Sequence, residues 1–181
     1  LGATLSQLCF EGPAEQLNQT NVSQPAIYTC SVASHAGIVE AAGEVGASAA
    51  AGLSLGEYTA LHLAGVFDFE TGLELVARRG RLMQDAAESS SGSMVALMGA
   101  DESEAVELCK DVLATFDEAA VLVPANFNAP GQIVLSGSTP ACAAAVVAAE
   151  ERGWRGKQLT VAGAFHSALM APAAEAMKAY L

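Results

Sequence analysis

Basic side chains are scarce in this chain. Eight Lys and Arg stand against 20 Asp and Glu among 181 residues, which gives a formal net charge of −12 and a pI near 4.4. Such a surface repels phosphate backbones and anionic lipid headgroups, so we expect neither nucleic acid nor a membrane as a partner. Aromatic residues are also few, at 6%, whereas 52% of the residues are hydrophobic. This composition is typical of a well-packed globular domain.

The chain also lacks closely spaced cysteines and long uninterrupted apolar runs. Its four cysteines show no Cys-x-x-Cys spacing, so we expect no metal site and an intracellular protein with free thiols. Residues 121–149 carry no charge, but Asn, Gln and Pro residues interrupt them, which excludes a membrane span. The first residue is not Met, and we expect a piece of a longer protein. Cytoplasm and an organelle matrix (plastid or mitochondrion) stay open as compartments.

The most informative motif is Gly-Leu-Ser-Leu-Gly at 52–56. It lies between a predicted strand of small residues, 47–53, and a predicted helix, 57–64. Gly-x-Ser-x-Gly in that position is typical of a nucleophile elbow, a tight turn around Ser54 whose two flanking glycines lack bulk. The backbone N–H of Leu55 is then directed at the oxyanion that forms when Ser54 attacks a carbonyl.

A second signal comes from the helix predicted between Asp68, its N-cap, and Glu88. The helical period gathers most of its charged residues on one face and its apolar residues on the other. Arg79 is the exception, because it points from the middle of the apolar face. An unpaired buried guanidinium is costly, so Arg79 needs either a buried carboxylate or an anionic ligand. The helical phase leaves both open.

The order of the predicted elements favours an α/β protein with two subdomains. Residues 92–161 have the β-α-β-β-α-β order of a ferredoxin-like unit. Its predicted strands are 94–98, 120–126, 132–136 and 157–161, and its predicted helices are 101–115 and 139–153. Residues 1–91 and 162–181 flank this insertion, and we expect them to form an α/β-hydrolase-like subdomain with a parallel sheet that carries the elbow.

Prolines predict two boundaries. Gln24-Pro25 is expected to separate a short helix at 13–18 from a longer helix at 26–42. Pro140 is expected at the first position of the helix that Thr139 caps.

A serine nucleophile needs a base, and the chain has three histidines. His35 and His62 fall within predicted helices, and we expect them to be surface or packing residues. His166 follows the strand predicted at 157–161, and loops at strand ends are where α/β folds gather their sites. We therefore predict that His166 is the general base of Ser54. No Asp or Glu stands out as its orienting group, so that group is either neutral or outside this chain.

Four segments together resemble malonyl-CoA:acyl-carrier-protein transacylases. They are Gly-Leu-Ser-Leu-Gly-Glu-Tyr-Thr-Ala-Leu at 52–61, Arg-Gly-Arg-Leu-Met-Gln at 79–84, Asn-Phe-Asn-Ala-Pro-Gly-Gln at 126–132 and Ala-Phe-His-Ser-Ala-Leu-Met at 164–170. Gln-Pro-Ala at 24–26 is also similar, so the resemblance spans nearly the whole chain. It implies ping-pong transfer: Ser54 takes the malonyl group from malonyl-CoA, with His166 as base, and the phosphopantetheine thiol of acyl carrier protein then accepts it.

The resemblance also implies roles for four other side chains. Arg79 is expected to bind the free carboxylate of malonate, and Met83, one helical turn further, to line the acyl pocket. Asn126 is expected near the pantetheine or acyl group, although asparagine also suits a turn. Phe165 matches the variant associated with malonyl rather than methylmalonyl selection. No cofactor is implied beyond the substrates, and we expect a monomer.

The sequence departs from the family pattern in three places. Leu53 stands where many relatives have His, and both an early Gly-Gln-Gly-like turn and the segment after Leu181 are absent from the sequence. The resemblance assigns the second oxyanion N–H and the group that orients the histidine to those two segments. The site within this chain is therefore expected to be incomplete.

Two other functions fit part of the pattern. A serine hydrolase such as a thioesterase would use Ser54 and His166 with water as acceptor, and would give Arg79 no substrate role. A non-catalytic domain would only dock a carrier protein. Arg152, Arg155 and Lys157 form the densest basic cluster for such docking, although a solvated helix end has the same pattern.

Overall fold

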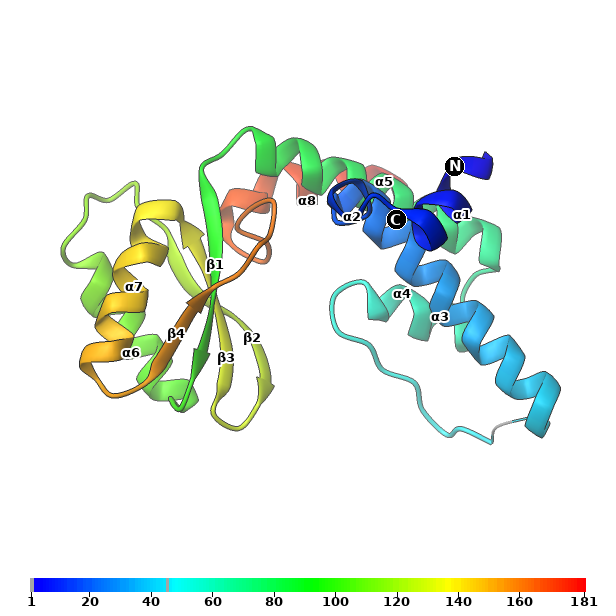
Figure 1. Ribbon diagram of the computed structural model, residues 1–181, viewed down its shortest axis with the longest axis horizontal. Helices are drawn as coiled ribbons and strands as arrows, with labels where there is room; N and C mark the ends of the chain where they lie inside the picture. The colour runs from blue at the N-terminus through cyan, green and yellow to red at the C-terminus, as the bar shows by residue number, and fades with distance from the viewer. Residues whose placement is uncertain (1, 45) are drawn as a thin grey trace. The chain divides into compact units, whose positions relative to one another are not determined.

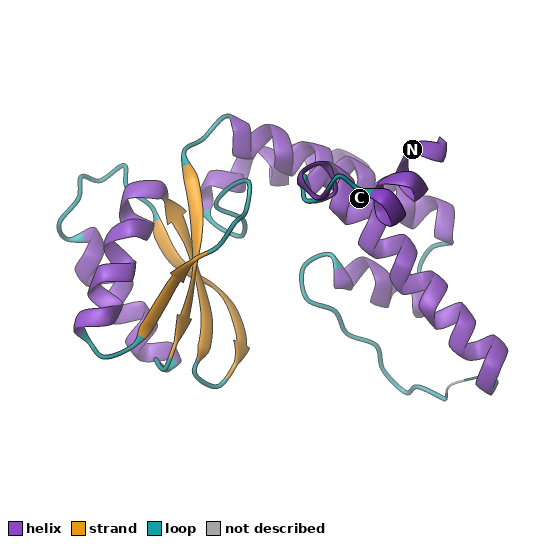
Figure 2. Cartoon of the chain, in the orientation of Figure 1, coloured by secondary structure: helices purple, strands orange, loops and turns teal. Residues whose placement is uncertain are grey.

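The computed structural model describes residues 2–44 and 46–181 (Figure 1). The chain divides into two compact units, Leu1–Leu82 with Tyr180–Leu181, and Met83–Ala179. Helices make up the first unit, and the second contains the sheet (Figure 2). The division falls inside one long helix, and the domain boundaries that the sequence predicts at 91/92 and 161/162 stay a prediction.

The first unit is built from α1 (Gly2–Glu11), α2 (Ala14–Leu17), α3 (Thr20–Ala42), α4 (Gly56–Leu63) and most of α5 (Phe69–Glu88). Local sequence rules account for two of the helix ends. After α4, Gly65 takes φ 77° and its N–H donates to the His62 carbonyl, as in a glycine C-cap. Asp68 caps α5 by accepting the N–H of Thr71 at 2.8 Å, and hydrogen bonding from the side chain and the backbone of Thr71 lowers the pKa of Asp68. Both predicted ends are confirmed.

Two glycines of α5 allow close packing against α3. A Cβ at Gly80 would lie 2.7 Å from the backbone oxygen of Thr20, and a Cβ at Gly72 would overlap the Tyr28 hydroxyl. Tyr28 is fully buried, which raises its pKa, and its ring stacks on Phe69. The core of this unit gathers side chains from three helices: Tyr28, Val32, Leu55, Tyr58, Phe69, Leu73 and Val76. The two glycines of α5 therefore allow the short distance between α3 and α5.

Two predictions for this unit are wrong. Gln24-Pro25 does not end a helix, because α3 is continuous from Thr20 to Ala42 and buries both residues. Pro25 forfeits one backbone hydrogen bond there, and burial of the helix face stabilises the segment despite that loss. Residues 47–53 do not form a strand, because they have no partner strand among the described residues and an isolated strand leaves its backbone groups unpaired. The parallel sheet is accordingly not formed within the described part of the chain.

The second unit contains a four-stranded antiparallel sheet of order β2-β3-β1-β4. Its elements are β1 (Gly92–Met98), α6 (Glu102–Leu113), β2 (Leu122–Ala129), β3 (Gln132–Ser138), α7 (Thr139–Glu151) and β4 (Arg155–Gln158). Short helices follow: η1 (Ala168–Met170), α8 (Ala171–Met177) and η2 (Lys178–Tyr180). The predicted β-α-β-β-α-β order is confirmed, and α6 and α7 cover one face of the sheet (Figure 1).

Side chains along each strand point alternately to the two faces of the sheet, and those on one face form the core of this unit. Side chains that face α6 and α7 are apolar and fully or nearly buried: Val95, Leu97, Leu122, Ile133 and Leu135. Two cysteines lie between the helices and the sheet, and burial raises the pKa of Cys109 to about 12 and that of Cys142 to about 11. Both are free thiols, as expected.

Two helices of this unit begin with N-cap residues, and one of these lies one position before the predicted cap. Asp101 and Glu104 form a capping box at the start of α6. Thr139 was predicted as the cap of α7, but Ser138 holds that position and Pro140 lies at the second helical residue, because β3 ends directly in the helix.

The two edge strands are irregular or short. β2 contains Pro124 and two register shifts, and β4 has four residues, of which Arg155 and Lys157 are exposed. Among the described helices, none has both the length and the apolar character that crossing a bilayer requires.

We predict that Gly80→Ala lowers the free energy of unfolding by about 1–3 kcal/mol, because the new methyl group meets backbone rather than a movable side chain. Gly37→Ala is the matched control, because Gly37 lies in α3 with open space around its Cα. That change is expected to be neutral or stabilising by up to about 1 kcal/mol. Urea unfolding followed by circular dichroism measures both, and equal effects would contradict the proposed helix spacing.

Candidate active site

Ser54 lies in a strained turn directly before α4. Its φ is 53°, a region that costs a non-glycine residue about 1–3 kcal/mol. Among the described residues, only Ser54 and His166 combine a side chain with a positive φ. Such strain persists where function requires it, and it falls here on the two residues that the sequence predicts as nucleophile and base.

The two glycines of the elbow are not equivalent. A Cβ at Gly52 would overlap the carbonyl group of Gly56, whereas a Cβ at Gly56 would meet nothing within 4 Å. The expectation that both flanking positions must lack bulk is therefore wrong for Gly56. Only Gly52 is required, because the chain folds back there onto the first turn of α4.

The hydrogen bonds of this turn leave the backbone of Leu55 well placed. Gly56 donates its N–H to the Leu53 carbonyl at 2.8 Å, and Glu57 donates to the Ser54 carbonyl at 3.3 Å. The Leu55 side chain is buried among the core residues, which fixes its backbone at the N-terminus of α4. Its N–H takes no part in these bonds, and its role as an oxyanion donor stays a prediction.

Arg79 reaches from α5 to the nucleophile. One terminal nitrogen of its guanidinium, Nη2, donates to Ser54 Oγ at 2.9 Å, and the other, Nη1, donates to Gln24 Oε1 at 2.6 Å. The predicted inward direction of Arg79 is confirmed, whereas its neighbours Arg78 and Arg81 are exposed. Neither ion pair that the structure describes includes Arg79, so a buried carboxylate partner is not what holds it.

Arg79 is partly withdrawn from solvent. Burial lowers the pKa of Arg79, but an arginine stays protonated even so. Its guanidinium lies 5.7 Å from the centre of the Tyr58 ring, and burial raises the pKa of the Tyr58 phenol. A cation whose hydrogen-bond partners are two neutral oxygens keeps a positive charge that an anion can bind.

Gln24 is a site residue that the sequence pattern does not reveal, because Gln24-Pro25 resembles a helix break. Its side chain is only 5% exposed, and its Nε2 donates to Thr20 Oγ1 at 2.9 Å while its Oε1 accepts from Arg79. A buried glutamine on the face of α3 that meets α5 was the available signal, but a continuous helix had to be recognised first.

His166 lies in the second unit, in the loop before η1. Ser167 braces this loop, because its hydroxyl donates to the Ala164 carbonyl at 2.7 Å and accepts the Leu169 N–H at 3.3 Å. His166 is exposed and Phe165 is partly buried. The roles of His166 as base of Ser54 and of Phe165 as a substrate contact stay predictions, and so does the role of Met83.

The other two histidines differ from His166. His62 Nδ1 lies 3.1 Å from the Phe67 carbonyl, and its ring meets those of Tyr28 and Phe69 edge-on. It is a packing residue, as expected. His35 is partly buried on α3.

Asn126 is a strand residue rather than the turn residue that its type also allowed. It lies in β2 next to a register shift and pairs with Val134 of β3. Val134 pairs with Ala96, and Ala96 pairs with Lys157 of β4. Paired residues share a face of a sheet, so these four form one row across the sheet. The substrate contact of Asn126 stays a prediction.

Arg152 does not belong to a free basic cluster. It forms an ion pair with Asp111 and lies over the Trp154 ring. Arg155 and Lys157 remain, and both are exposed on β4. A Cβ on Gly156, between them, would touch α7, so Arg155 and Lys157 point to the opposite face, where the Asn126 row lies.

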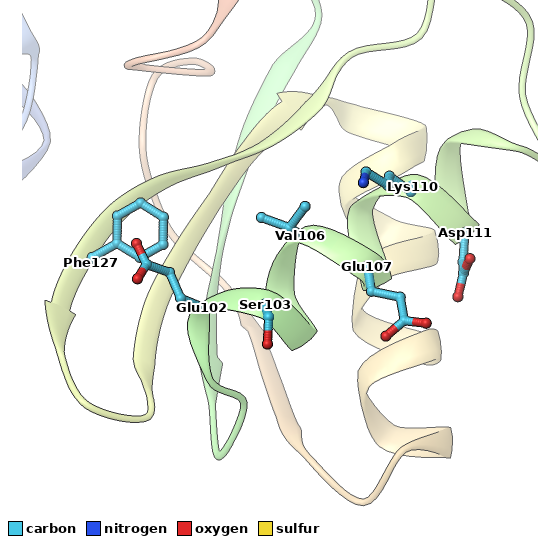
Figure 3. Close-up of a pocket in the computed structure, with 7 residues that line it drawn as sticks. All are labelled: Glu102, Ser103, Val106, Glu107, Lys110, Asp111 and Phe127. Carbon is cyan, nitrogen blue, oxygen red and sulfur yellow. The ribbon is translucent and has the colours of Figure 1, made fainter.

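A pocket of about 750 Å³ is lined by α6 and by Phe127 of β2 (Figure 3). Acidic side chains dominate its lining: Glu102, Glu107 and Asp111 against one Lys110, with Val106, Ser103 and Phe127. Figure 3 shows these carboxylates on α6 and the Phe127 ring at the end of β2. The pocket includes none of the predicted site residues, and its charge does not suit an acidic ligand. The described residues also contain no group of His, Cys, Asp and Glu able to hold a metal ion.

The whole chain, residues 1–181, matches the family model described as acyl transferase domain. The chain therefore belongs to the acyl transferase domain family, and the resemblance to malonyl-CoA:acyl-carrier-protein transacylases is confirmed. It is 41% identical over 176 residues to the malonyl CoA-acyl carrier protein transacylase of Haemophilus influenzae, covering 97% of this chain and 55% of the relative. The protein of the same name from Bacillus subtilis is 41% identical over 184 residues, covering 100% and 56%.

Solved structures show the same fold. The acyl-carrier-protein S-malonyltransferase of Burkholderia pseudomallei superposes with a TM-score of 0.91 at 37% identity, covering 99% of this chain and 57% of that one. A malonyl-transacylase in complex with a type II PKS acyl-carrier protein gives 0.88 at 39% identity, covering 97% and 55%. The chain spans about half the length of the relatives that it matches.

We predict that Gly52→Ala prevents acylation of Ser54, because the added methyl group displaces the elbow from α4. Gly56→Ala is the matched control and is expected to retain most of the reaction. Labelling with a fluorophosphonate probe, read by mass spectrometry of the Ser54 peptide, measures both. Equal labelling of the two variants would contradict the close approach at Gly52.

Proposed function

We propose that the protein transfers the malonyl group of malonyl-CoA to the phosphopantetheine thiol of acyl carrier protein, through an ester on Ser54. The observation that carries the proposal is the 2.9 Å hydrogen bond from Arg79 to Ser54 Oγ. A partly buried cation at the nucleophile suits a thioester whose acyl chain ends in a carboxylate. Malonyl fits by length, because its carboxylate lies one methylene beyond the carbonyl that Ser54 attacks.

The first half-reaction acylates the enzyme. His166 accepts the hydroxyl proton while Ser54 Oγ attacks the thioester carbonyl, and the Leu55 N–H donates to the oxyanion. The substrate carboxylate takes over guanidinium donors of Arg79, so that Oγ is released from Arg79 for the attack. The C–S bond then breaks, and the leaving CoA thiolate takes the proton back from His166.

The second half-reaction reverses the roles. The phosphopantetheine thiol of the carrier protein gives its proton to His166 and its sulfur attacks the ester carbonyl. Ser54 leaves with that proton, and the malonyl thioester remains on the carrier protein. Group transfer of this kind needs no redox or metal cofactor. The protein is proposed to act inside the cell as a monomer.

We predict that Arg79→Ala lowers kcat/KM for malonyl-CoA by at least about 10³-fold, because the carboxylate is left without its cation in a desolvated site. Transfer of an acetyl group is expected to be unchanged or faster. Arg78→Ala is the matched control, because Arg78 is exposed on the same helix. Transfer to carrier protein is followed with labelled acyl-CoA.

Two results would contradict the proposal. Equal losses for malonyl and acetyl groups would remove the substrate role of Arg79. Hydrolysis of malonyl-CoA at the same rate with and without carrier protein would identify a hydrolase, and the lack of a malonyl adduct on Ser54 would leave only a docking function.

Carrier proteins are acidic, so we propose that Arg155 and Lys157 attract them. The double variant Arg155→Glu with Lys157→Glu is expected to raise KM for carrier protein by about 10-fold, consistent with losing two rim charges. Formation of the malonyl-Ser54 ester is expected to change by less than about threefold. Lys110→Glu, a charge reversal in the acidic pocket of α6, is the control. If Lys110→Glu raises KM for carrier protein as much as the double variant does, the effect comes from net charge alone.

A further inference from the structure

We infer that Gln24 is a positioning residue that sets acyl specificity by holding Arg79 with a neutral partner. This inference rests on the proposed function, because it explains how the cation stays available for a substrate carboxylate. The observation is a polar chain of four side chains, Thr20–Gln24–Arg79–Ser54, joined by hydrogen bonds of 2.9, 2.6 and 2.9 Å.

The first step is the burial of the chain's inner end. Gln24 is 5% exposed and Thr20 is 8% exposed, at the start of α3. Burying an amide and a hydroxyl is unfavourable unless they form hydrogen bonds with each other or with neighbours. An apolar side chain at position 24 would fill the same space without that cost, so the glutamine has a purpose other than packing.

The second step is the direction of the amide. The Nε2 group of Gln24 donates to Thr20 Oγ1, and this turns Oε1 toward Arg79. With the opposite orientation, the amide would present N–H groups to a cation that can only donate. Thr20 therefore determines which end of the amide meets the guanidinium.

The third step is the spacing of the helices. Gly80, next to Arg79, lets α5 approach the backbone of Thr20, where a Cβ would lie 2.7 Å from the carbonyl oxygen. The short 2.6 Å bond between Arg79 and Gln24 depends on that approach. The polar chain and the close contact between α3 and α5 both involve Thr20, at the start of α3.

The fourth step is charge. A carboxylate at position 24 would form an equally short bond, but it would neutralise the guanidinium and compete with the substrate. An amide oxygen fixes the position of Arg79 and leaves its full charge in place. The two bonds use one N–H on each terminal nitrogen, so the Nε–H and two further N–H groups stay available for a carboxylate. Tyr58 and Glu57, in the first turn of α4, also act on Arg79 through charge, and the effect of Glu57 is the smaller of the two.

The test uses three substitutions and two readouts. Gln24→Glu keeps the shape and adds a charge, Gln24→Met keeps the length and removes the acceptor, and Thr20→Val frees the amide to turn. Gln16→Glu, on exposed α2, adds the same charge without touching Arg79 and is the control. The readouts are kcat and KM for malonyl-CoA and acetyl-CoA, and the side-chain ¹H–¹⁵N NMR signal of Arg79.

Gln24→Glu is expected to raise KM for malonyl-CoA by about 10²-fold, with acetyl transfer within about threefold of the wild-type rate, as loss of one charge-assisted pair predicts. Gln24→Met is expected to lower malonyl kcat/KM by about 10-fold, as loss of one hydrogen bond to a charged group predicts. Thr20→Val is expected to act in the same direction by a smaller factor, and Gln16→Glu to change neither rate. A residue with a merely structural role would lower both acyl transfers together.

The NMR readout separates this inference from the proposed function. An Arg79 signal that moves and broadens in Gln24→Met, but not in Gln16→Glu, supports positioning by Gln24 whether or not the protein transfers malonyl groups. An Arg79 signal unchanged in Gln24→Met overturns positioning, and an unchanged malonyl-to-acetyl ratio in Gln24→Glu overturns the role in specificity. If the wild-type protein forms no malonyl-Ser54 ester while the Arg79 signal still responds, the proposed function fails and the positioning role stands.

Discussion

The close contact between α3 and α5 is the constraint on which the candidate site depends. Because Gly80 has no side chain, the backbone of α5 comes next to that of Thr20, and Arg79 then reaches Gln24 and the elbow serine. A wider helix spacing would leave a solvated arginine with ordinary surface behaviour. The hydrogen bonds of Arg79 to Gln24 and Ser54 thus depend on a glycine at the next position of α5.

Partial burial gives that placement an electrostatic consequence. The guanidinium lies among Tyr58, an amide and a hydroxyl, and neither of the ion pairs described includes it. In such surroundings a charge interacts strongly with an incoming anion and gains little from an uncharged chain. The same guanidinium binds Ser54 Oγ, so the only cation that the structure describes at the elbow lies within hydrogen-bond distance of the predicted nucleophile.

Local rules in the sequence account for several helix ends and for the direction of Arg79. Asp68 and Gly65 bound their helices as expected, since caps depend on a few neighbouring residues. Gln24-Pro25 and the segment 47–53 were misjudged, because a proline in a buried helix and a strand without a partner are decided by tertiary contacts. Gln24 was missed for the same reason: its importance comes from a residue 55 positions away. That Ser54 and His166 converge stays a prediction, which rests on the family resemblance and on the positive φ that both residues share.

The edges of the antiparallel sheet have a consequence for the protein's behaviour in solution. An exposed strand edge is a template on which another chain can add a strand, and proteins that offer one tend to aggregate. Here a proline and two irregular pairings interrupt β2, and β4 is only four residues long with two exposed cations. Neither edge offers a long regular row of free backbone groups. The small sheet can therefore remain open at both sides without recruiting a second copy of itself.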